Sequence, residues 1–129
     1  MTKTSINILN SIDENKKISI SLPSCPHYLI TGGTGSGKTT YSLYLLGKLC
    51  LTYKNAKVYI LDFKGDDQFS RFNNYKNYFS YVDCIAGLRE VYEIFSERLK
   101  NTGNFYPLII FIDELASMIS YFSRTTSEK

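Results

Sequence analysis

Two short stretches contain the residues best suited to chemistry, and the first fits a phosphate-binding loop. Gly32 is followed, after four residues, by Gly37-Lys38-Thr39, which matches the pattern G-x-x-x-x-G-K-[ST] known as Walker A. Glycines let the backbone approach a ligand closely, and the loop amides together with a helix N-terminus form a socket for an anion. The predicted nucleotide-binding residues are Gly32, Gly33, Thr34, Gly35, Ser36, Gly37, Lys38, Thr39 and Thr40.

The residue types in this loop indicate ATP with Mg²⁺ as the ligand. Lys38 would place a positive charge between the β- and γ-phosphates, and the Thr39 hydroxyl would ligate the Mg²⁺ that bridges them. The dinucleotide fingerprint G-x-G-x-x-G does not fit, because Lys38 or Thr40 stands where its last glycine is required. A glycine-rich turn without a ligand is the alternative, and the lysine and threonine argue against it.

The second stretch is a pair of carboxylates, Asp113 and Glu114, directly after the apolar run of residues 108–112. Ionised carboxylates beside a buried strand are costly unless a cation or hydrogen bonds compensate them. This is the Walker B pattern, in which Asp113 would hold Mg²⁺ and Glu114 would deprotonate the attacking water. The predicted catalytic residues are Glu114 and Lys38, and the predicted metal ligands are Thr39 and Asp113. Alternatively, the two acids only favour a helix N-terminus.

Both stretches need strands and helices to position them. Residues 28–31 read as an apolar strand that enters the loop, and the spacing of Tyr41, Leu45 and Leu49 predicts a helix through about Cys50 that covers one face of the sheet. Gly47 weakens that helix, which indicates close packing on a strand.

Residues 57–61 read as a parallel strand buried on both faces, and it ends at Asp62-Phe63-Lys64-Gly65. Polar groups just beyond such a strand face the ligand crevice of α/β sheets, so Asp62 and Lys64 are second-rank site candidates. A simple turn pair is the alternative.

The next elements are a short helix at residues 66–72, a strand at 78–82 and a longer helix that Asp83 would cap. One apolar stripe is predicted on that longer helix. It consists of Leu88, Val91, Tyr92, Phe95 and Leu99. The aromatic residues between Phe69 and Tyr81, interleaved with Arg71 and Lys76, suit core and subunit packing better than a platform for stacking nucleic-acid bases.

The N-terminal segment alternates apolar and polar residues around Ile6 and again around Ile20, which predicts a two-stranded hairpin or an edge addition. We therefore divide the chain into residues 1–27 and a partial P-loop core at 28–129. A length of 129 residues suits one domain, and the net charge of +3 permits a nucleic-acid partner without indicating one. Three scattered cysteines and no long apolar run predict a cytoplasmic segment without membrane contact, although the parent protein could be tethered to a membrane.

With both motifs placed, the sequence resembles the FtsK/SpoIIIE branch of the RecA-like ATPases, within the FtsK/HerA group, from about Pro23 to Met118. Pro26-His27-Tyr28-Leu29-Ile30 resembles the Pro-His-Leu-Leu entry to the Walker A strand of that family. Leu61-Asp62-Phe63-Lys64-Gly65 resembles its Asp-Pro-Lys-Gly segment, with phenylalanine in place of proline. Ile112-Asp113-Glu114-Leu115-Ala116 resembles its Asp-Glu-Leu-Ala Walker B segment.

The resemblance implies a three-layer α/β/α P-loop fold with a mainly parallel sheet, which we expect to be truncated after the Walker B strand. It also implies an ATP-hydrolysing motor that moves double-stranded DNA through a hexameric ring, with the coupling proteins of conjugative elements as the nearest type. Whether this chain hydrolyses ATP without the family's further core strands stays open. A non-catalytic nucleotide-binding interaction module is the alternative. A small P-loop kinase ranks lower, because it would need a lid rich in arginine and the four arginines of this chain are not clustered.

Overall fold

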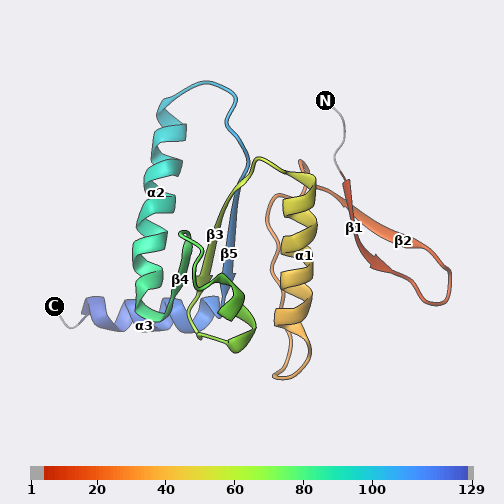
Figure 1. Cartoon of the computed structure of the whole chain (residues 1–129), viewed down its shortest axis with the longest axis horizontal. Helices are drawn as coiled ribbons and strands as arrows, with labels where there is room; N and C mark the ends of the chain where they lie inside the picture. Colours follow the sequence, from red (N-terminus) through yellow and green to blue (C-terminus); the bar gives the residue numbers. More distant parts are fainter. Residues whose placement is uncertain (1–4, 128–129) are drawn as a thin grey trace. The chain divides into compact units, whose positions relative to one another are not determined.

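The computed structural model describes residues 5–127, and the chain divides into two compact units, residues 1–54 and 55–129, each described by itself. The first unit contains β1 (Ser5–Asn10), β2 (Lys17–Ser21) and α1 (Lys38–Thr52). The second contains β3 (Lys57–Asp62), η1 (Asp67–Phe72), β4 (Tyr78–Ser80), η2 (Tyr81–Asp83), α2 (Cys84–Lys100), β5 (Leu108–Asp113) and α3 (Leu115–Ser127), as labelled for the helices and strands in Figure 1.

The first unit is built on the N-terminal hairpin. β1 and β2 pair antiparallel, with Ile6 opposite Ile20, and the alternation of the sequence puts their apolar side chains on one face. Ile6 and Leu22 are buried there with Leu45 of α1, so α1 packs against the hairpin within this unit. The helix predicted from its spacing is therefore present, and its apolar stripe has the hairpin as a partner.

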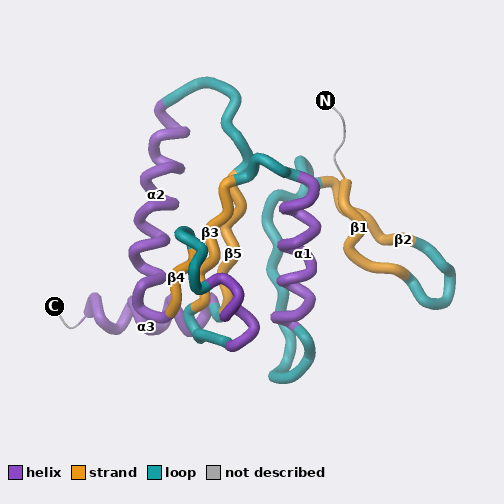
Figure 2. Tube along the Cα trace, viewed as in Figure 1, coloured by secondary structure: helices purple, strands orange, loops and turns teal. Residues whose placement is uncertain are grey.

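The strand predicted at residues 28–31 is absent. Figure 2 shows this segment as loop, and in its own unit the hairpin strands pair only with each other. Tyr28 and Ile30 pack against the hairpin cluster, whereas Leu29 is 81% exposed. The alternation of sides suits an extended chain, but a strand also needs a neighbour to receive its ladder hydrogen bonds, and this segment has none among the described residues of its unit.

The second unit is a three-stranded parallel sheet in the order β4-β3-β5. Its central strand, β3, is buried on both faces, because the successive residues Tyr59, Ile60 and Leu61 are each at most 2% exposed. Leu61 packs toward Cys84 of α2, and Phe69 of η1 lies against Phe111 of β5, with ring centroids 5.7 Å apart. The predicted parallel strand at 57–61 is thus confirmed. Phe69 is fully buried, as expected for a core aromatic. This mixed α/β arrangement is compatible with a RecA-like P-loop fold.

The chain between β4 and α2 differs from the prediction. The strand predicted to reach residue 82 stops at Ser80, because Tyr81 has a φ of 50°, outside the range of extended backbone. Asp83 has a helical φ of −68°, and its side chain makes no capping hydrogen bond. An N-cap side chain reaches the free amides from an extended residue, so the short turn η2, which continues directly into α2, removes the geometry that capping requires.

The apolar stripe predicted on α2 is only partly turned to the core. Val91 is buried and Leu88 packs on the cluster around Leu61, but Tyr92 is 71% exposed and Leu99 is 73% exposed. The face on the sheet is instead centred on Gly87, which lies beside Leu61. The predicted stripe and the stripe that contains Gly87 lie next to each other on α2 and repeat at the same helical spacing, so the periodicity of the sequence cannot distinguish them.

No helix within residues 5–127 has the length and apolar character needed to cross a bilayer.

The two helix-interior glycines provide a matched stability test. A methyl group on Gly87 would lie 2.6 Å from the side chains of Leu61 and Phe79, whereas one on Gly47 meets nothing within 4 Å, contrary to the close packing predicted there. Gly47→Ala should stabilise the protein by up to about 1 kcal/mol through helix propensity. Gly87→Ala should destabilise it by about 1–3 kcal/mol through overpacking. Urea denaturation measures both; stabilisation by both substitutions would contradict the packing.

Candidate functional site

The glycine-rich loop has the backbone that its sequence predicts. Gly35 and Gly37 have φ values of 75° and 83°, a region that side chains other than glycine rarely enter. The carbonyl of Gly37 accepts the amide of Tyr41 at 2.9 Å, so α1 begins immediately after the loop, at Lys38. The first amides of a helix have no partner within the helix, and these therefore adjoin the loop amides.

A side chain of the loop binds back to the backbone of the loop. The Lys38 ammonium donates a hydrogen bond across the loop to the carbonyl of Gly33 at 3.0 Å. A Cβ added to Gly32 would lie 2.7 Å from the Ser36 hydroxyl oxygen, so only glycine fits there without displacing that side chain. The first turn of α1 has no acidic residue to compete for its positive end. These groups are a cation and amide donors, and they fit the phosphates of a nucleotide.

Two of the predicted carboxylates lie side by side at the carboxyl ends of β3 and β5. The parallel register pairs Asp62 with Asp113, so both residues stand at the carboxyl edge of the sheet. Asp113 is half-buried, and its pKa is raised, first by burial and then by the negative charges of Asp62, Glu114 and Asp66; the Lys64 ammonium partly opposes this. The Asp113 carboxylate is therefore held at a cost that a divalent cation would reduce.

The side chain of Asp62 is fully buried and accepts hydrogen bonds from two donors. One oxygen accepts the amide of Gly65 at 2.8 Å, and the other accepts the Tyr78 hydroxyl at 3.0 Å. Asp62 thus holds the turn that follows β3, which is the turn role left open by the sequence. Lys64, within that turn, is exposed.

Glu114 lies at the junction between β5 and α3 in a conformation unusual for its type. Its φ is 57°, in the left-handed region, and its carbonyl accepts the amide of Met118 at 3.0 Å to start the helix. The side chain is exposed and lies 3.5 Å from the Ser117 hydroxyl. Strained backbone at a non-glycine residue is common at functional sites, so this junction supports a functional assignment for Glu114.

The acids fit Mg²⁺ by the chemistry of their oxygens, although they are too few to enclose it. No group of three or more histidine, cysteine, aspartate or glutamate side chains among residues 5–127 is arranged to hold a metal ion. Mg²⁺ is commonly bound through one or two protein groups, several waters and the phosphates of a nucleotide. The Asp113 carboxylate suits that mode as one such protein group.

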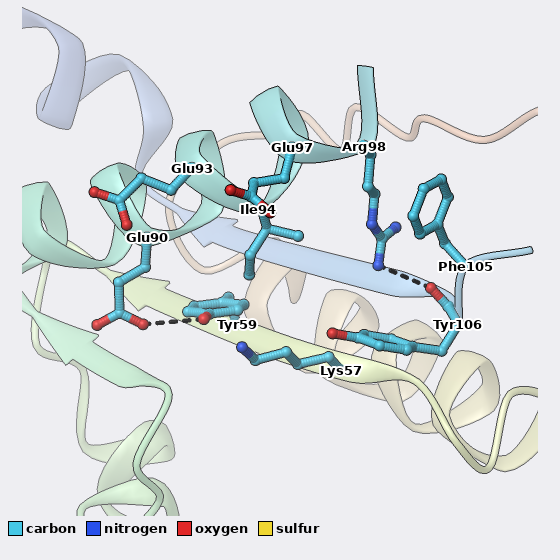
Figure 3. Close-up of a pocket in the computed structure, with 9 residues that line it drawn as sticks. All are labelled: Lys57, Tyr59, Glu90, Glu93, Ile94, Glu97, Arg98, Phe105 and Tyr106. Atoms are coloured by element: carbon cyan, nitrogen blue, oxygen red, sulfur yellow. Dashed lines mark hydrogen bonds between the residues drawn. The ribbon is translucent and has the colours of Figure 1, made fainter. Parts of the chain in front are cut away.

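A separate cleft of about 450 Å³ lies at the opposite end of β3, between its first residue and α2 (Figure 3). Its polar groups bind one another: the Tyr59 hydroxyl donates to Glu90 at 3.0 Å, and Arg98 donates to the Tyr106 carbonyl at 2.9 Å. The Lys57 ammonium lies over the Tyr59 ring. Ligands of parallel α/β sheets bind at the carboxyl ends of strands, so this cleft is not the nucleotide site.

The structure brings together Asp62, Asp113 and Glu114 at one edge, while the loop from Gly32 to Thr40 is formed in the first unit. Sequence reasoning missed Tyr78, whose hydroxyl binds Asp62, and Asp66, whose charge acts on Asp113. A buried carboxylate at the end of a strand requires hydrogen-bond donors, so the sequence could have predicted that Asp62 has donor partners. It could not identify Tyr78 as one of them, because that depends on which strand lies beside β3.

Comparison with protein-family models relates the chain to known proteins. The model of the FtsK/SpoIIIE family matches residues 2–118, a span that includes the loop at Gly32 and the carboxylates at Asp113 and Glu114. No curated protein and no solved structure matches the chain.

The electrostatics of Asp113 predict a trade between stability and function. Asp113→Asn removes a charge that the fold disfavours, so the nucleotide-free protein should gain up to about 1 kcal/mol at neutral pH, limited by partial solvation. Because the folded-state pKa is raised, the cost of the charge is present above that pKa and disappears as the pH falls below the unfolded value. Thermal unfolding at pH 7 and pH 4 measures the difference between the two proteins. A gain at pH 4 as large as that at pH 7 would contradict this account.

Proposed function

Since the chain belongs to the FtsK/SpoIIIE family, we propose that it forms the ATP-binding and ATP-hydrolysing motor core of a DNA translocase. The observation that carries the proposal is the family match, which spans both chemical motifs. The geometry of the loop supports it, because the amides, the ammonium of Lys38 and the glycine conformations suit a triphosphate.

Each predicted residue has one task in the proposed reaction. The loop from Gly32 to Thr40 binds the phosphates, and Lys38 exchanges its hydrogen bond to the Gly33 carbonyl for the β- and γ-phosphate oxygens. Thr39 and Asp113 would hold Mg²⁺, which supplies charge neutralisation on the phosphates when bound. Glu114 accepts a proton from the water that attacks the γ-phosphorus, so that ADP leaves and inorganic phosphate is formed.

The finer assignments are also proposals. Double-stranded DNA is the substrate for movement, a homohexamer is the working assembly, and the cytoplasm is the compartment. Within the family, the segments around Asp62 and Asp113 favour a coupling protein of a conjugative element. DNA-stimulated release of phosphate by the purified protein tests the translocase assignment. ATP binding without hydrolysis, with or without DNA, would instead indicate a nucleotide-binding interaction module.

The first substitution tests the phosphate socket. Lys38→Met removes the only ammonium of the loop and keeps the length of the side chain, so Mg-ATP affinity should fall on the order of 100-fold, as expected for a charged hydrogen bond to phosphate. Isothermal calorimetry measures this. Lys48→Met is the control, since Lys48 lies on the same helix and contacts the ring of Tyr44. Equal loss of affinity in both variants would remove Lys38 from the socket.

The second substitution separates binding from chemistry. Glu114→Gln keeps the shape of the side chain but cannot accept the proton of water, so Mg-ATP should still bind while turnover falls by about 10²–10⁴-fold. Single-turnover hydrolysis and calorimetry on the same preparation measure the two quantities. Turnover equal to that of the unaltered protein would exclude Glu114 as the general base.

A further inference from the structure

The carboxyl edge of the sheet contains two charges that the proposed reaction does not use, the Asp62 carboxylate and the Lys64 ammonium. Asp62 is the register neighbour of Asp113 and is fully buried. Lys64 follows it by two residues in the same turn and is exposed. A fixed charge beside a metal ligand changes the affinity of that ligand even without contact, and burial increases its effect.

Asp62 is not positioned to ligate an ion itself. Both of its oxygens already accept hydrogen bonds, one from the Gly65 amide and one from the Tyr78 hydroxyl, and no part of the residue reaches the surface. The ladder between β3 and β5 nevertheless places the Asp62 carboxylate next to Asp113. Its effect on a cation at Asp113 is therefore electrostatic.

The turn after β3 is built to keep this arrangement fixed. Gly65 has a φ of 70°, and the ring of Tyr81 occupies the space that a Cβ at Gly65 would need. Phe63 packs against Tyr121 and Phe122 of α3, with centroids 5.5 and 5.9 Å away. The turn is thus anchored to β4 through Tyr78, to η2 through Tyr81 and to α3 through Phe63, so the backbone of Lys64 has little freedom.

We propose that Asp62 and Lys64 are positioning residues that set the divalent-cation affinity of Asp113 with opposite signs and without touching the ion. The buried carboxylate of Asp62 adds negative potential at the Asp113 oxygens and strengthens cation binding. The ammonium of Lys64 adds positive potential and weakens cation binding. This inference rests on the proposed function of Asp113 as a metal ligand.

The test measures the affinity of Mn²⁺ in the presence of saturating ADP by electron paramagnetic resonance, because Mn²⁺ prefers the same oxygen ligands as Mg²⁺. Asp62→Asn keeps an oxygen acceptor for Gly65 and removes the charge; the affinity should fall on the order of tenfold. Lys64→Met should raise it by about threefold, a smaller change because Lys64 is solvated. Asp67→Asn, at an exposed residue of η1, is the matched control and should leave the affinity unchanged.

The outcomes separate this inference from the function on which it rests. Opposite shifts in the two variants, with the control unchanged, support it. If the unaltered protein binds Mn²⁺ with ADP but Lys64→Met and Asp62→Asn leave the affinity within about twofold, the inference is wrong and the proposed function stands. If Asp62→Asn fails to fold, Lys64→Met alone decides, since an exposed side chain can be replaced without disturbing the core. If the unaltered protein binds neither Mn²⁺ nor ADP, both proposals fail.

Discussion

The second unit depends on the parallel ladder between β3 and β5, which places Asp62 and Asp113 side by side. Two carboxylates in adjacent positions of a sheet repel each other, and burial of one of them increases the cost. The fold tolerates Asp62 because the Gly65 amide and the Tyr78 hydroxyl satisfy both of its oxygens. For Asp113, burial and the charges of Asp62, Glu114 and Asp66 outweigh the opposing Lys64 ammonium, so its pKa is raised. A site that is unfavourable when empty favours a cation.

Helices α2 and α3 both pack against the end of the sheet that contains Asp62 and Asp113. Gly87 lets α2 approach Leu61 and Phe79 closely, which buries the end of β3 beneath a helix. Phe63 stands where the resembled family segment has proline, and its ring packs against the aromatic side chains of α3.

Four of the six positive-φ residues in the described part of the chain lie at or beside candidate functional residues: Gly35 and Gly37 in the loop before Lys38, Gly65 in the turn that contains Lys64, and Glu114 itself. The other two, Asn15 and Tyr81, lie in turns with no functional assignment. Glycine removes the steric cost at three of the first four positions, and at Glu114 the cost remains. Tyr92 and Leu99 of α2, in contrast, have regular helical backbone and exposed side chains, and none of the functional assignments in this chain involves them.

The sequence alone determined the glycine-rich loop, the Asp113 and Glu114 pair, the buried strand β3 and the family, because these features are local patterns of residue type and spacing. The strand predicted to be buried before Asp113 is present as β5, but it is only partly buried, and Ile110 is 42% exposed. It did not determine which segments become partners. Residues 28–31 have the pattern of a strand but no ladder neighbour in their unit, Asp83 precedes a helix without capping it, and α2 turns Gly87 to the sheet while Tyr92 faces solvent. Hydrogen-bond partners and the rotation of a helix are settled by contacts between distant residues, so only the tertiary structure showed that Asp62 is buried beside Asp113.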